Sequence, residues 1–192
     1  MADTDAEKWN AVYSAGGHAR NEPAMVLKEF AHLLPDTGTA LDLACGRGAN
    51  ALFLAKRGLN VHAWDISDAA IKILNEKMND LSLTFDTRIC DVTEEPPKTD
   101  SFDVIVVSYF LDRNLIPAII KALRKNGLLF YQTYIREFID DTGPRNEDYR
   151  LAENELLHLC QGLHILLYRE EGLVGNTQHG FRNEAMLIGQ RR

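Results

Sequence analysis

The sequence is poor in cysteine and contains no long apolar run. Its three cysteines, Cys45, Cys90 and Cys160, form neither a C-x-x-C pair nor an even set for disulfide bonds. This pattern favours reduced thiols in a cytoplasmic protein. No apolar stretch approaches the ~20 residues that a helix needs to cross a bilayer, and the acidic start, MADTDAEKWN, lacks the features of a signal peptide. We therefore expect a soluble protein that does not bind a membrane.

Positive charge is also scarce. The 192 residues include 28 Asp and Glu but only 21 Lys and Arg, which gives a formal net charge of −7. A protein that binds duplex nucleic acid needs a positive face, so a nucleic-acid partner is not expected. The six histidines show no metal-ligand spacing, and we expect no metal. None of the six tyrosines is followed four residues later by Lys, which argues against a short-chain dehydrogenase.

Hydrophobic patterning predicts strands that alternate with helices. The expected strands cover residues 39–45, 60–66, 83–92, 101–110, 128–134, 163–170 and 184–190. The expected helices cover residues 24–34, 49–58, 67–80, 115–127 and about 152–160, with Ser67 as an N-cap. Such alternation predicts an α/β fold in which helices cover both faces of a seven-stranded, mostly parallel sheet. The last two strands are joined by a loop alone, so they should form an antiparallel C-terminal hairpin.

The length suits a single domain over residues 1–192. Within it we expect an N-terminal helical cap (1–36), a cofactor-binding core (37–134) and a substrate-side part (135–192) that contains a loop, a helix and the hairpin. Ligands of such folds bind at the carboxyl ends of the strands. Three expected strands end close to an acid there, namely Asp42, Asp65 and Asp91.

A glycine turn, Gly46-Arg47-Gly48, follows the first of these strands. The stretch GRGANA fits the dinucleotide fingerprint G-x-G-x-x-A, so an NAD(P)-binding oxidoreductase is one alternative. That fingerprint binds a pyrophosphate, which the Asp42 carboxylate would repel if it faces the cleft. Two like charges ~4 Å apart cost about 1 kcal/mol even in water. An adenosine ligand with a cationic head suits the three acids better. S-adenosylmethionine is such a ligand, with Asp42 near its amino group, Asp65 on its ribose and Asp91 on its adenine amino group.

Five motifs resemble those of class I S-adenosylmethionine-dependent methyltransferases, in order over residues 38–134. They are ALDLACGRGAN, VHAWDIS, ICDV, FDVIVVSYFL and ALRKNGLLFYQTY. The chain is similar to the small, single-domain members of the thiopurine and tellurite-resistance kind, and KWNAVY resembles their opening helix. The resemblance implies a Rossmann-like fold and S-adenosylmethionine as cofactor. The residues expected to contact that cofactor are Trp9, Tyr13, Asp42, Ala44, Gly46, Gly48, Asn50, Asp65, Ile66, Asp91, Val92 and Ser108.

The expected chemistry is methyl transfer to a small molecule. This in-line displacement mainly needs alignment and exclusion of water, and a thiolate or chalcogen oxyanion acceptor needs no general base. The candidates for a role at the acceptor are Tyr109, Arg113, Tyr134 and Arg145, with Asp112 and His179 as candidates by position only. Arg145 lies in the polar loop after the fifth expected strand and is the first candidate to steer an anionic acceptor; a solvated surface arginine is the alternative. A protein that binds the cofactor without catalysis is a further alternative.

Overall fold

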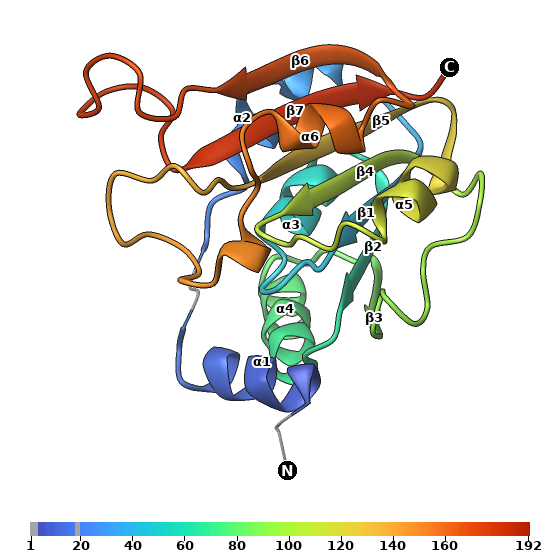
Figure 1. Ribbon diagram of the computed structural model, residues 1–192. Coiled ribbons are helices and arrows are strands. Elements are labelled where there is room, and N and C mark those ends of the chain that lie inside the picture. The colour runs from blue at the N-terminus through green and yellow to red at the C-terminus, as the bar shows by residue number, and fades with distance from the viewer. Residues whose placement is uncertain (1–3, 18–19) are drawn as a thin grey trace.

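The computed structural model describes residues 4–17 and 20–192 and contains one seven-stranded sheet (Figure 1). The strand order is β3-β2-β1-β4-β5-β7-β6. The strands are β1 (Thr39–Leu43), β2 (Asn60–Asp65), β3 (Asp86–Ile89), β4 (Phe102–Ser108), β5 (Leu123–Tyr134), β6 (His164–Glu170) and β7 (Glu184–Gln190). Strands β1 to β5 pair in parallel, whereas β7 pairs antiparallel with both β5 and β6. The expected sheet and its antiparallel hairpin are confirmed.

Helices cover both faces of this sheet because neighbouring residues of each strand point to opposite sides. The helices are α1 (Asp5–Ser14), α2 (Met25–Glu29), α3 (Ala49–Lys56), α4 (Asp68–Asp80), α5 (Ile116–Ala122) and α6 (Glu155–Leu159), with 3-10 turns at Ala31–Leu33 and Glu147–Tyr149. On β1, Leu41 packs in the core that includes α5 and α6. Its neighbour Ala40 packs in the core that includes α2, α3 and α4. Two apolar layers therefore enclose the sheet.

Two of the expected helices are wrong in extent. The helix expected over 24–34 ends at Glu29, and a separate 3-10 turn follows, because Phe30 leaves the helical region with φ −107° and ψ 23°. The helix expected over 115–127 stops at Ala122, and residues 123–127 already belong to β5. Leu123 pairs with Phe102 of β4 and is fully buried. Tertiary pairing thus overrides the helical propensity of this segment.

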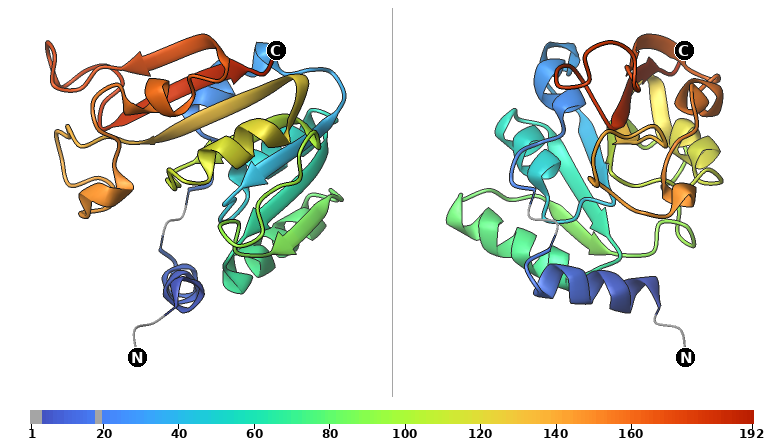
Figure 2. Two further views of the ribbon diagram at one scale, coloured as in Figure 1. Left: turned by 45° about the vertical axis from the view of Figure 1, so that its right-hand side comes forward. Right: turned by 60° about the vertical axis from the view of Figure 1, so that its left-hand side comes forward.

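Helix α1 lies beside the beginning of α4 and apart from the sheet (Figure 2). Thr4 and Glu7 form a capping box at its beginning, which satisfies two free backbone N–H groups. None of its ten residues is buried. The Ser67 hydroxyl donates to Oδ1 of Asn10 at 2.6 Å and also accepts from the Ala70 N–H, which confirms Ser67 as the N-cap of α4. This contact holds α1 next to the carboxyl ends of the strands.

Candidate functional site

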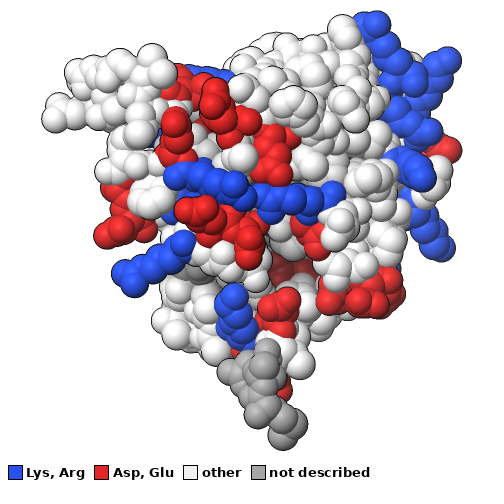
Figure 3. All heavy atoms as spheres, viewed as in Figure 1, with Lys and Arg blue, Asp and Glu red and all other residues white. Residues whose placement is uncertain are grey.

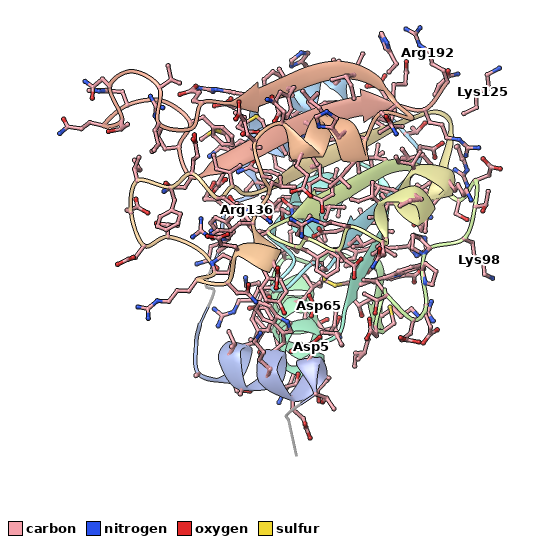
Figure 4. The ribbon with its side chains drawn as sticks, in the orientation of Figure 1. Asp5, Asp65, Lys98, Lys125, Arg136 and Arg192 are labelled. Atoms are coloured by element: carbon pink, nitrogen blue, oxygen red, sulfur yellow. The ribbon has the colours of Figure 1, made fainter. Side chains whose placement is uncertain are left out.

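A pocket of about 550 Å³ lies at the carboxyl ends of β1, β2 and β4, where the expected ligand site was placed. Its walls come from α1, the glycine turn, the segment after β3, the segment after β4 and the loop that follows β5. Figure 4 shows Asp65 between the sheet and α1, whereas Lys98, Lys125 and Arg192 lie along the right-hand edge of the view. Basic side chains gather at that edge in Figure 3, and both signs of charge alternate over the middle of the same face. The pocket therefore lies away from the most basic surface.

The glycine turn brings backbone to the pocket wall. Gly46 has φ +53°, and a Cβ placed on it would lie 2.6 Å from the Tyr13 hydroxyl. Gly48 has φ +72°, but a Cβ there would lie 2.3 Å from Cδ1 of Leu74 on α4. Gly46 thus permits a close approach in the pocket, whereas Gly48 permits close packing of the turn against α4.

Asp65 braces the same turn. Its Oδ2 accepts from the Gly46 N–H at 2.7 Å, and its Oδ1 accepts from the Ser67 N–H at 2.9 Å. The side chain is 5% exposed, and burial raises the pKa of its carboxyl, although these two hydrogen bonds oppose the shift. Each oxygen has a second lone pair, so a ligand with two neighbouring hydroxyls can still bind.

Asp42 faces α3 instead of the pocket, which corrects the arrangement assumed from the sequence. Its oxygens accept from the Ala51 N–H at 2.9 Å and from Nδ2 of Asn50 at 3.3 Å. The side chain is fully buried, and burial raises its pKa to about 7. Asn50 stands between Asp42 and the pocket and also donates to the Ser108 hydroxyl at 2.9 Å. Asp42 therefore orients Asn50. Because Asp42 does not face the pocket, it would repel a bound pyrophosphate less than we expected from the sequence.

The far end of the pocket suits a planar, apolar group. Ile66 and Val92 line it together with Cys90 and Asp91. One oxygen of Asp91 accepts from both the backbone N–H and the hydroxyl of Thr93, at 2.9 Å and 2.7 Å. The other oxygen accepts no hydrogen bond from the described residues, so it is available to a donor on a ligand.

Two aromatic rings of α1 close the pocket on the outer side. The ring centroids of Trp9 and Tyr13 are 5.9 Å apart, as their spacing along the helix predicts. Burial raises the pKa of Tyr13 well above its usual value. Arg47 donates to the carbonyl of Tyr13 at 3.3 Å, which ties α1 to the glycine turn. Ala44 completes the wall on the inner side.

Tyr109 and Tyr134 also line the pocket, and their ring centroids are 5.3 Å apart. Tyr109 adopts φ +58°, which is unusual for a bulky side chain and is a conformation that clusters at functional sites. The Arg20 guanidinium lies 3.5 Å from the centroid of the Tyr109 ring and donates to the Tyr134 hydroxyl. Gln132 and Glu184 hold the Tyr109 hydroxyl from behind.

Sequence reasoning missed Arg20, Gln132 and Glu184. A signal for Gln132 was present, because a polar residue inside the apolar run LLFYQTY needs buried partners. Gln132 is 1% exposed and accepts from the Val26 N–H at 2.7 Å. Arg20 lies outside every periodic segment, so no local pattern points to it.

The two candidate arginines have different surroundings. Arg145 is exposed at the pocket mouth and forms no ion pair with the described residues. Arg113 lies outside the pocket wall, which corrects its candidacy as an acceptor anchor. It donates to Glu155 at 2.6 Å and to the carbonyls of Asp148 and Arg150, so it holds the loop that carries Arg145.

Buried Arg150 stabilises the same loop from inside. It donates to the carbonyls of Ile135, Thr142 and Pro144. Of the candidates by position, Asp112 lines the pocket, and its Oδ1 accepts from the Asn114 and Leu115 N–H groups in the turn that precedes α5. His179 lines a second, neighbouring cavity.

No helix among residues 4–17 and 20–192 is both long and apolar enough to cross a membrane. In the same part of the chain, no group of three or more His, Cys, Asp or Glu side chains is arranged to hold a metal ion.

Comparison with known proteins identifies the family. The family model described as "Tellurite resistance protein TehB" matches residues 25–183. A curated relative from Haemophilus influenzae, named "Probable S-adenosyl-L-methionine-dependent methyltransferase TehB", is 31% identical over 136 residues, which are 68% of this chain and 47% of the relative. The chain thus spans about half the length of the curated relatives that it matches.

Solved structures agree with this fold. The crystal structure of TehB from Haemophilus influenzae has a TM-score of 0.69 at 25% identity, over 96% of this chain and 67% of that chain. The geranyl diphosphate C-methyltransferase of Streptomyces coelicolor, solved with S-adenosyl-L-homocysteine, has a TM-score of 0.69 at 14% identity, over 87% of this chain and 76% of that chain, and shows the fold alone. The chain belongs to the TehB family and has the Rossmann-like fold of class I S-adenosylmethionine-dependent methyltransferases.

Proposed function

We propose that this protein transfers a methyl group from S-adenosylmethionine to a small-molecule acceptor. The observation that carries the proposal is the pocket of about 550 Å³, in which Asp65, the Gly46 turn and Asp91 lie along successive strand ends. Family membership supports the same activity. A nicotinamide dinucleotide fits less well, since the family and the curated relatives are not described as oxidoreductases.

Different residues contact the ribose, the adenine and the methionine part of the cofactor. Asp65 accepts from the ribose hydroxyls, and Asp91 accepts from the adenine amino group between Ile66 and Val92. Gly46 and Ala44 leave room for the methionine part, with Asn50 and Ser108 as its polar neighbours. Trp9 and Tyr13 cover the bound molecule and exclude water from the reacting atoms. Gly48 and Asp42 support this site from behind, through α4 and Asn50.

Bound there, the cofactor supplies an electrophilic methyl group on a sulfonium. The protein then needs to align a nucleophile with that group and keep the site dry. Tyr109 and Tyr134 give the acceptor side an aromatic wall. We infer that the acceptor is a thiolate, a chalcogen oxyanion or another small anion, because Arg145 has no ion-pair partner among the described residues and stands at the pocket mouth.

Transfer of a labelled methyl group tests this function. Small thiols, chalcogen oxyanions, carboxylates and phenols are offered with methyl-labelled S-adenosylmethionine, and at least one should become labelled. Absence of label on every acceptor, with the cofactor bound, would favour a binding protein without catalysis.

The role of Arg145 has its own test. Arg145→Ala should raise the Michaelis constant for the acceptor and leave the affinity for the cofactor unchanged. Arg192→Ala is the matched control, since Arg192 lies at the opposite edge from Asp65 (Figure 4). An unchanged Michaelis constant in Arg145→Ala, or an equal loss of cofactor affinity, would contradict the role of an acceptor anchor.

A further inference from the structure

A second cavity, of about 980 Å³, adjoins the first at Tyr109. The two cavities share Arg20, Glu22 and Tyr109 as lining residues. The second one opens between the segment before α2 and the loop that joins β6 to β7, which extends from the body of the protein in Figure 1. A ligand in it would therefore contact Tyr109, which also lines the proposed cofactor pocket.

Glu184 is a half-buried carboxylate in the wall of this cavity. Its Oε2 accepts from Nε2 of Gln132 at 2.5 Å and from the Tyr109 hydroxyl at 3.3 Å. Gln132 cannot turn away, because its own oxygen accepts from the Val26 N–H and it is buried in β5. Oε1 of Glu184 accepts no hydrogen bond from the described residues. The network thus fixes one oxygen and leaves the other for a ligand.

Arg20 supplies the opposite charge next to Glu184. Its guanidinium stacks on the Tyr109 ring and donates to Tyr134 through one nitrogen, and no described acid lies within ion-pair distance of it. It is close enough to Glu184 to oppose the rise that burial causes in the pKa of that carboxyl. A guanidinium and a carboxylate therefore flank one aromatic ring, and neither has an ion-pair partner among residues 4–17 and 20–192.

The other charged side chains of the cavity wall, apart from the exposed Glu29, have partners. Lys28 and Glu22 form an ion pair at 3.0 Å. Arg182 donates to backbone carbonyls and lies 3.8 Å from Glu171, and Asp140 accepts from Asn183 and Thr142. A ligand gains most from the two unpaired groups, since a charge-assisted hydrogen bond in a partly buried site is stronger than one between neutral groups.

We propose that this cavity binds a small zwitterion with the ammonium and carboxylate groups of an amino acid. Glu184 accepts from the ammonium group, and Arg20 donates to the carboxylate. Together with the proposed methyl transfer, on which this part rests, the zwitterion is the recognition end of the acceptor, and its sulfur extends past Tyr109 toward the cofactor pocket. The thiol first loses its proton to water; the thiolate then forms a bond to the methyl carbon as the bond from that carbon to the sulfonium breaks, which gives a methyl thioether and S-adenosylhomocysteine. The acceptor class is therefore an amino-acid thiol.

Calorimetric titration with three probes tests the site without turnover. S-methylcysteine carries both charged groups, 2-(methylthio)ethylamine lacks the carboxylate, and 3-(methylthio)propionate lacks the ammonium. Each is titrated into the full chain, with and without saturating S-adenosylhomocysteine. S-methylcysteine should bind at least tenfold more tightly than either of the other two. Equal affinity of the three probes, or binding of none, would overturn the proposal, and this comparison needs no variant.

Glu184→Gln assigns the ammonium contact. It should weaken S-methylcysteine and 2-(methylthio)ethylamine at least tenfold and leave 3-(methylthio)propionate unchanged. Glu29→Gln, an exposed acid at the outer rim, removes the same charge and should change none of them. An unchanged affinity for S-methylcysteine in Glu184→Gln refutes the assignment. Binding of S-methylcysteine without any binding of S-adenosylhomocysteine would refute the proposed methyl transfer and leave the cavity assignment standing.

Discussion

Replacement of Asp65 separates its two roles, because the carboxylate both braces the glycine turn and faces the pocket. Asp65→Ala leaves the N–H groups of Gly46 and Ser67 without their acceptor. An unsatisfied buried group costs about 1–3 kcal/mol, so the free energy of unfolding should fall by about 2–6 kcal/mol. Domains of this size are typically stable by about 5–15 kcal/mol, so the variant should still fold at low temperature.

The affinity for the cofactor should fall as well. A hydrogen bond to a charged group contributes about 1.5–3 kcal/mol, which corresponds to a loss of about 10- to 150-fold at about 1.4 kcal/mol per factor of ten. Asp65→Asn keeps one acceptor oxygen but removes the charge. It should lose a similar amount of affinity and about half as much stability.

The assay combines thermal unfolding with calorimetric titration of S-adenosylhomocysteine. Asp80→Asn, an exposed acid at the end of α4, serves as the control for loss of one negative charge. If Asp65→Asn is folded at the temperature of the titration and binds S-adenosylhomocysteine with unchanged affinity, Asp65 does not contact the cofactor and the ribose assignment fails.

Two further predictions concern residues behind the pocket. The pKa of Asp42 is raised to about 7, so between about pH 4 and pH 7 the folded state binds more protons there than the unfolded state, and the contribution of Asp42 to stability falls as pH rises. Asp42→Asn should flatten this part of the stability profile measured by urea unfolding; a difference from wild type that is constant from pH 4 to pH 7 would contradict the assignment. Gly48→Ala should lower the free energy of unfolding by about 2–5 kcal/mol, from the left-handed backbone and the contact with Leu74. Gly175 also has a left-handed φ, of +74°, but open space surrounds it, so Gly175→Ala should lower the free energy of unfolding by only about 1–2 kcal/mol. If the two variants lose the same free energy of unfolding, packing of Gly48 against α4 is unimportant.

The sequence predicted the sheet well because buried strands and their connections leave a periodic signal. The apolar run that became β4 and the loop-only link between β6 and β7 were sufficient to predict a mostly parallel sheet with an antiparallel C-terminal hairpin, but not the strand order. The helix expected over residues 123–127 is wrong because their helical propensity is local, whereas their pairing with β4 and with Arg191 depends on distant residues. Element boundaries of this kind are set by tertiary contacts.

Site residues that follow strand ends could be predicted from the sequence, whereas the placement of Asp42, Arg20 and Glu184 could not. Asp65 and Asp91 line the pocket as their positions at strand ends suggested. Asp42 turned to α3 because strand alternation places it on that face, next to the free N–H groups at the beginning of the helix. Arg20 and Glu184 come from segments far apart in the chain, so only the folded structure shows that they adjoin.

We propose that the pocket under α1 binds the methyl-donor cofactor, and titration with S-adenosylmethionine, S-adenosylhomocysteine and NAD tests this binding directly. We expect both sulfur-containing compounds to bind to one site per chain, with no heat from NAD. Binding of NAD without binding of either S-adenosyl compound would contradict it.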